Sequence, residues 1–112
     1  MLRASARARR PDFAPVFAAL GDRTRLSLVG RLADGVPRSI AALTEDGAIT
    51  RQAVTKHLRV LEGAGLVRAE RSGRESLYAL RPEPLEAARA YLAGVSRQWD
   101  DALGRLKAFV DG

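Results

Sequence analysis

Basic and hydrogen-bonding side chains gather on one side of a stretch with helical periodicity. Val54, Leu58 and Leu61 are spaced as the buried face of a helix over residues 51–62. Five polar residues then share the opposite face: Arg51, Gln52, Thr55, Lys56 and Arg59. Gln can bond adenine through two atoms, Arg and Lys can reach guanine or phosphate, and a Thr methyl can meet thymine while its hydroxyl reaches a phosphate. This face is a candidate for contact with duplex DNA, the alternative being an ordinary solvated basic face.

A second basic feature follows this helix. Period-two patterns over residues 66–71 and 74–80 predict two strands, and Ser72-Gly73 predicts a two-residue turn between them. Arg71 and Arg74 flank the turn, where they can straddle a phosphate or enter a minor groove. The alternative is a hairpin end that is basic only for solubility.

His57 is the single histidine and lies near the edge of the predicted core face. A packed, hydrogen-bonded role and a contact with phosphate or a base are both open for it. A chain with one His and no Cys cannot supply a typical structural zinc site, so we expect no metal and no cofactor.

The elements that must position these residues are mostly helical. Helices are predicted over residues 11–20, 23–33, 39–44 and 51–62. Three of them follow residues suited to cap a helix N-terminus, namely Asp22, Ser39 and Thr50. In the second helix we expect Leu26, Val29 and either Leu32 or Ala33 to face the core. A short helix, a turn and a second helix, followed by a hairpin, predict a mainly α winged helix-turn-helix with the order α-α-α-α-β-β-α.

A long last helix is predicted over residues 83–110. Apolar residues recur along it at alternating spacings of three and four, as in a coiled-coil seam. Packing on the chain's own core is the alternative, but we favour self-association through the first and last helices. The expected dimer contacts are Phe13, Phe17, Leu92, Val95, Trp99, Leu106 and Phe109.

Composition narrows the class of protein. The 112 residues suffice for one domain, and 46% hydrophobic content is enough for a core. The net charge is +6, with the excess in residues 1–10 and 51–82, which favours an anionic partner. We expect residues 1–10 to form a disordered, Arg-rich arm and residues 11–112 to form a single winged-helix domain.

Several other classes are not expected. No run approaches the roughly 18 apolar residues of a membrane span, so we expect a cytoplasmic protein without membrane contact. The sequence has no phosphate-binding glycine loop and no recognisable nucleophile motif, and we therefore expect no enzyme.

Three stretches resemble the ArsR/SmtB family of bacterial winged-helix repressors: residues 17–26 (FAALGDRTRL), 49–67 (ITRQAVTKHLRVLEGAGLV) and 72–80 (SGRESLYAL). The resemblance extends over residues 13–110. It implies a homodimer, formed through the first and last helices, that represses transcription from a palindromic operator. It also places Arg51, Gln52, Thr55, Lys56 and His57 on the recognition helix and Arg71 and Arg74 on the wing.

The chain departs from the metal-sensing members of that family. Many of them carry Cys-x-Cys on the first helix of the helix-turn-helix, where this chain has residues 39–44 (SIAALT). Others bind zinc on the last helix, which here has no His and only Asp100 and Asp101 as an acidic pair. The resemblance is thus to the non-metal-sensing branch. A small-molecule effector is compatible with the sequence, which marks no pocket for one.

The sequence therefore predicts a sequence-specific DNA-binding transcriptional regulator, a homodimeric repressor with double-stranded DNA as its partner. The alternative is a dimeric interaction module whose basic face binds an acidic protein.

Overall fold

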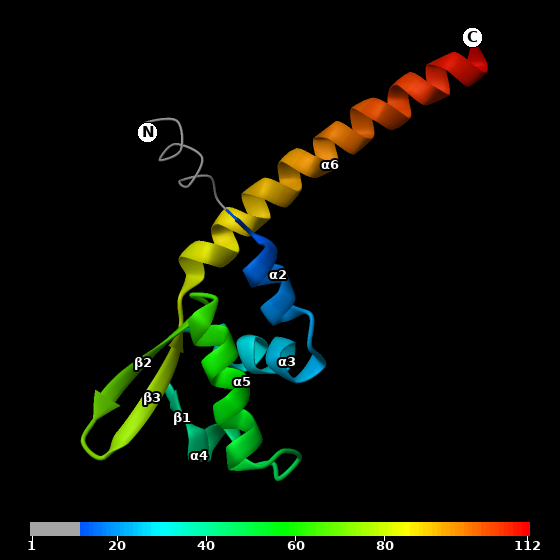
Figure 1. The fold of residues 1–112 in the computed structure, drawn as a ribbon. Coiled ribbons are helices and arrows are strands. Elements are labelled where there is room, and N and C mark those ends of the chain that lie inside the picture. Colours follow the sequence, from blue (N-terminus) through cyan, green and yellow to red (C-terminus); the bar gives the residue numbers. More distant parts are fainter. Residues whose placement is uncertain (1–11) are drawn as a thin grey trace, which may run out of the picture. The chain divides into compact units, whose positions relative to one another are not determined.

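The computed structural model describes residues 12–112, so the expected N-terminal arm lies outside the described residues. In chain order the elements are α2 (Ala14–Leu20), α3 (Arg23–Leu32), β1 (Arg38–Ser39), α4 (Ile40–Leu43), α5 (Arg51–Gly63), β2 (Val67–Ser72), β3 (Glu75–Leu80) and α6 (Pro82–Asp111) (Figure 1). They form two compact units that meet in the sequence between Arg81 and Pro82. The predicted mainly helical fold with a β-hairpin is confirmed.

The first unit has a small aliphatic core. Its largest fully buried side chains are Leu32, Leu43, Val54, Leu58, Leu61, Leu66 and Val67. The three predicted N-caps are all present: backbone N–H groups of Arg25, Ala42 and Ala53 donate to the side chains of Asp22, Ser39 and Thr50 at 3.0, 3.1 and 3.1 Å. These caps satisfy donors that the first turn of a helix leaves unpaired, and so fix where α3, α4 and α5 begin.

One expectation about the core is wrong. Leu28, Val29 and Leu32 are the buried residues of α3, whereas Leu26 is 56% exposed. Leu28 and Leu32 lie one turn apart and set the inner face of the helix. Leu26 precedes Leu28 by two residues, more than half a turn, and therefore points away from the core.

The sheet has three antiparallel strands in the order β1-β3-β2. The sequence predicted only the last two. The additional strand, β1, has two residues, with Arg38 opposite Tyr78 and Ser39 opposite Leu77. Because β1 runs directly into α4, this pairing ties the start of α4 to the hairpin.

The hairpin turn lies one residue later than predicted. Ser72 pairs with Glu75, so the two-residue loop is Gly73-Arg74 rather than Ser72-Gly73. Gly73 has φ 61°, a left-handed conformation that a glycine adopts at the first position of a tight hairpin loop. Arg74 therefore lies in the loop itself, while Arg71 lies on β2.

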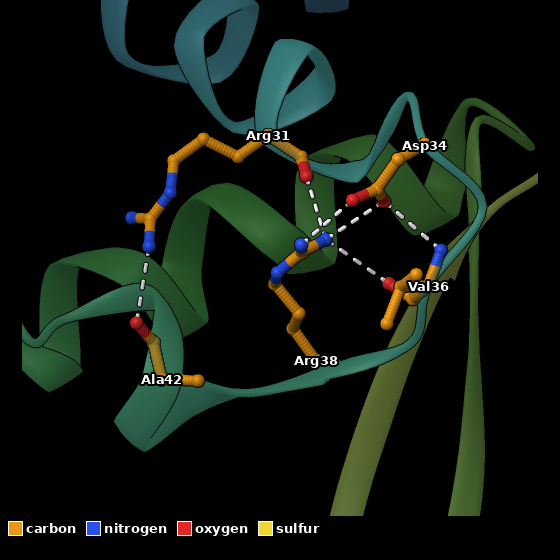
Figure 2. A network of polar contacts seen from close by, with 5 residues as sticks. All are labelled: Arg31, Asp34, Val36, Arg38 and Ala42. Atoms are coloured by element: carbon orange, nitrogen blue, oxygen red, sulfur yellow. Dashed lines mark hydrogen bonds and ion pairs between the residues drawn. The ribbon is translucent and has the colours of Figure 1, made fainter.

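Two arginines secure the connection from α3 to α4 (Figure 2). Arg38 donates from Nη1 to the Arg31 carbonyl at 2.7 Å and holds Asp34 through both nitrogens of its fork. Arg31 in turn donates to the carbonyls of Ala42 and Leu43 at 3.1 and 2.8 Å, which are the last residues of α4. Directional bonds thus hold α4 in place although it has only four residues.

The second unit is a single continuous helix, α6, of 30 residues. It begins one residue before and ends one residue after the predicted span. Much of its apolar stripe is exposed within the protomer, with Trp99 at 64%, Leu106 at 57% and Phe109 at 83%. Among the described residues, no helix is long and apolar enough to cross a membrane.

Candidate nucleic-acid interface

Helix α5 has one completely buried face. Val54, Leu58 and Leu61 each have 0% exposure, as their spacing predicted. The Thr50 hydroxyl fixes the start of the helix by accepting from the Ala53 N–H. The buried face determines which side of α5 points outward, and the cap determines where the helix begins.

The polar residues predicted for that outer face lie on it. Arg51, Gln52, Lys56 and Arg59 are exposed, and Thr55 is partly buried. Arg51 and Gln52 occupy the first turn, the part of a recognition helix that usually contacts bases. The backbone N–H groups of that turn also favour a phosphate oxygen.

Thr55 differs from the expectation in one respect. Its hydroxyl donates to the Arg51 carbonyl at 2.8 Å, one turn earlier in α5. A phosphate oxygen only accepts hydrogen bonds, so this hydroxyl has no proton left for one. Toward a base, Thr55 can offer its methyl, or its hydroxyl oxygen as an acceptor, but not a hydroxyl proton.

A cavity of about 340 Å³ lies beside the first turns of α5. Arg51 and Thr55 line it from α5, Glu75 and Ser76 from β3, and residues 39–41 from the start of α4. The sequence did not single out Glu75 or Ser76, because their place beside α5 depends on the hairpin register. The cavity joins the outer face of α5 to the hairpin in one concave surface.

Arg71 and Arg74, the predicted wing residues, are both exposed. Arg71 lies opposite Ser76 in the ladder, and Arg74 lies at the tip. In contrast, Arg68 on the same strand is already paired with Glu70 at 2.9 Å. Arg71 and Arg74 are thus the hairpin cations that carry uncompensated charge.

The charges of the candidate surface are unpaired. Within residues 12–112, the ion pairs are Asp34–Arg38, Asp22–His57, Arg68–Glu70 and Glu86–Arg89. None of them includes the cations of this surface, which are Arg51, Lys56, Arg59, Arg71 and Arg74. These five cations have no ion-pair partner among the described residues. They outnumber the one carboxylate that lines the cavity, Glu75, and give the surface a positive potential suited to a polyanion.

His57 points elsewhere. Its side chain is 23% exposed, and its Nδ1 lies 3.8 Å from Asp22 Oδ2 and 3.4 Å from Arg25 Nη1. These partners belong to the N-terminal end of α3. These contacts fit the packed, hydrogen-bonded role, while a contact of His57 with phosphate or a base stays a prediction.

The predicted dimer residues lie in both units. The rings of Phe13, the residue before α2, and Phe17 on α2 have centroids 6.4 Å apart, and Phe17 is 37% exposed. On α6, Leu92 is 49% exposed and Val95 is partly buried. Among residues 12–112, no group of three or more Asp, Glu and His side chains is arranged to hold a metal ion.

Comparison with known proteins identifies this arrangement. Residues 20–70 match a family described as a helix-turn-helix domain. The chain is 39% identical to the HTH-type transcriptional regulator Rv2034 of Mycobacterium tuberculosis, over 92% of this chain and 91% of that protein.

The solved structure of an ArsR-like transcriptional regulator from Rhodococcus sp. RHA1 matches with a TM-score of 0.79 and 33% identity, over 88% of this chain and 90% of that one. The cadmium metal-sensor CMTR from Mycobacterium tuberculosis matches with a TM-score of 0.52 and 39% identity, over 62% of this chain and 70% of that one. The chain therefore belongs to the ArsR/SmtB family of winged helix-turn-helix proteins, which regulate transcription by binding DNA.

Proposed function

We propose that this regulator is a homodimeric repressor that binds a two-fold symmetric operator with α5 in the major groove. The observation that carries the proposal is the contrast between the two faces of α5. The inner residues Val54, Leu58 and Leu61 are completely buried, while the outer cations are exposed and have no ion-pair partner among the described residues. The fold thus presents a positive face of fixed orientation.

Within that face, position along α5 separates two roles. Arg51 and Gln52 are in the first turn. We propose that both contact base edges, with Gln52 bonding adenine and Arg51 bonding guanine. Lys56 and Arg59 follow one and two turns later, where they are proposed to bind the phosphate backbone. The methyl of Thr55, which is partly buried, is proposed to meet thymine.

The wing adds a second contact. Arg71 and Arg74 lie on and beyond the end of β2, and both are exposed. We place them against phosphates or in the minor groove that flanks the half-site. Contacts of this kind position the protein along the duplex and contribute affinity more than sequence preference.

The second subunit is proposed from the exposed apolar stripe of α6. Trp99, Leu106 and Phe109 are each more than half exposed in the protomer, which is unusual for large apolar side chains of a stable monomer. A two-fold axis through such a stripe would bury it between two subunits. It would also bring a second copy of α5 into the same assembly. Two copies of α5 would then enter successive major grooves about 34 Å apart. Phe13 and Phe17 of α2 are proposed to join the interface.

Selection of DNA from a random pool by the purified protein tests this function. We expect a palindrome with two half-sites, bound as one dimer per site. The logarithm of the affinity should fall linearly with the logarithm of the salt concentration, with a slope of about −0.9 per phosphate contact. The same site placed at a promoter should reduce transcription in a purified system when the protein is added.

Two results would contradict the proposal. If the selected site is bound no more tightly than scrambled DNA, the protein does not read sequence. If an acidic polypeptide such as polyglutamate displaces selected DNA as well as the unlabelled site does, the basic face serves an acidic protein instead.

A further inference from the structure

One arginine of α3 contacts two other helices of the DNA-binding unit. Arg25 is the third residue of α3, and its Nε donates to the Ala19 carbonyl at 2.6 Å. Its Nη2 donates to the Ala18 carbonyl at 3.4 Å, and its Nη1 lies 3.4 Å from Nδ1 of His57 on α5. The carbonyls belong to the C-terminal end of α2, where the Ala18 carbonyl also accepts from the Gly21 N–H at 3.2 Å. A single planar side chain therefore joins α2 and α3 to the recognition helix.

The contact with His57 is a hydrogen bond in one tautomer of the ring. A guanidinium only donates, so Nδ1 accepts from Arg25 when the ring carries its proton on Nε2. Asp22, 3.8 Å from the same nitrogen, is held in place because its carboxylate caps α3 by accepting from the Arg25 N–H at 3.0 Å. Residues 22 and 25 thus form one rigid corner against which His57 packs.

This corner lies away from the DNA-facing side of α5. His57 is two residues from both Thr55 and Arg59, more than half a turn of helix in either direction. Its side chain and that of Arg25 are both partly buried. The nitrogens of Arg25 are occupied by acceptors on α2 and α5, which distinguishes it from the unpaired cations of the outer face.

We propose that Arg25 is a positioning residue for operator binding, which sets the rotation and axial position of α5 through His57 without touching DNA. The proposal rests on the proposed function and deepens it. The apolar face of α5 alone cannot fix these two coordinates sharply, because apolar burial is not directional. A hydrogen bond loses strength when its angle or distance changes, and so selects one placement of the helix. Because a hydrogen bond is stronger in a partly buried site than in water, partial burial sharpens this selection of one helix placement.

The first test compares Arg25→Lys with Arg23→Lys as a matched control. Both changes keep the charge, and Arg23 is an exposed neighbour on the same turn. A lysine carries its three donors on one nitrogen and cannot reproduce the separate positions of Nε and Nη1, which contact the Ala19 carbonyl and His57. We expect Arg25→Lys to weaken binding of the selected operator about tenfold, equivalent to one hydrogen bond to a charged group, and Arg23→Lys to leave it unchanged. The salt dependence should have the wild-type slope in both variants.

The second test removes the other partner. His57→Leu keeps bulk but has no acceptor, whereas His57→Asn keeps an acceptor close to the position of Nδ1. We expect His57→Leu to lose as much affinity as Arg25→Lys, His57→Asn to recover most of it, and the double variant Arg25→Lys/His57→Leu to lose no more than either single change. Active fractions measured by stoichiometric titration, and circular dichroism melting, separate these losses from unfolding.

Several outcomes would overturn the proposal. If Arg25→Lys binds the operator as tightly as wild type, Arg25 does not position α5. A salt slope reduced by about 0.9 in the charge-removing variant Arg25→Gln makes Arg25 a phosphate contact. Additive losses in the double variant, or no recovery by His57→Asn, show that the two residues act separately. Wild-type protein that selects no DNA sequence contradicts operator binding itself, which is a different failure and is seen before any variant is made.

Discussion

Both carboxylate oxygens of Asp34 accept hydrogen bonds from Arg38, at 2.9 Å from Nη1 and 2.8 Å from Nη2. The pair joins the end of α3 to the two-residue strand β1. The backbone N–H of Val36 adds a third hydrogen bond to the same carboxylate at 3.0 Å. The Arg38 guanidinium first, and then the Val36 N–H, hold the pKa of the Asp34 carboxyl well below its usual 3.8. The turn between α3 and β1 is thus built around an ionised Asp34.

This pairing predicts an acid-sensitive contribution to stability. A carboxyl with a lowered pKa in the folded state stabilises the fold above the pKa of the unfolded chain, and the contribution disappears as the pH falls below that value. We expect the melting temperature of wild type to fall between pH 5 and pH 2 more steeply than that of Asp34→Asn. Asp101→Asn, an exposed carboxylate on α6, is the control and should follow wild type. Equal pH dependence in Asp34→Asn would show that the pair does not contribute to folding.

Gln52 and Lys56 are expected to contribute to DNA binding in different ways. Gln52 should contribute to sequence preference, and Lys56 to affinity for any sequence. Gln52→Ala should cost about 1–3 kcal/mol and relax the base preference at one position of each half-site. Lys56→Ala should instead weaken binding to all sequences alike and reduce the salt slope by about one. Titration of the selected site and its single-base variants separates the two patterns. A uniform loss in Gln52→Ala would assign Gln52 to the backbone.

Thr55 offers a sharper comparison, because its hydroxyl is already bonded to the Arg51 carbonyl. Thr55→Val keeps a methyl at the DNA-facing position and removes the hydroxyl, while Thr55→Ser does the reverse. We expect operator affinity to be nearly unchanged in Thr55→Val and reduced in Thr55→Ser, most strongly at sites with thymine. The opposite order, measured by anisotropy titration, would show that the hydroxyl leaves Arg51 to contact DNA.

Local patterns predicted most of the fold, and contacts between distant residues account for what they missed. The caps at Asp22, Ser39 and Thr50 are local, and all three form as expected. Strand β1 is only two residues long and forms through its pairing with β3, so no local sequence pattern predicts it. The hairpin loop is displaced by one residue because Ser72-Gly73 and Gly73-Arg74 both suit a two-residue turn, and only the pairing of the flanking strands decides.

The candidate site shows the same division. The outward placement of the cations on α5 follows from three apolar residues on its other face. The direction in which the His57 side chain points does not follow from the local sequence, because its partner Arg25 lies 32 residues earlier in the chain. The cavity residues Glu75 and Ser76 were missed because hairpin register decides which side chains meet α5.

Trp99 carries the last prediction, which concerns the dimer. Its side chain is 64% exposed in the protomer and is central to the apolar stripe of α6. If a partner subunit covers it, Trp99→Ala should weaken dimerisation strongly, since truncation of a buried Trp costs about 3–5 kcal/mol. Gln98→Ala, one position away on the same helix, is the control. Sedimentation equilibrium at micromolar concentration should show monomer only for Trp99→Ala, and operator affinity should fall with it because two linked half-sites are no longer read together. A Trp99→Ala variant that sediments as wild type would place the interface elsewhere.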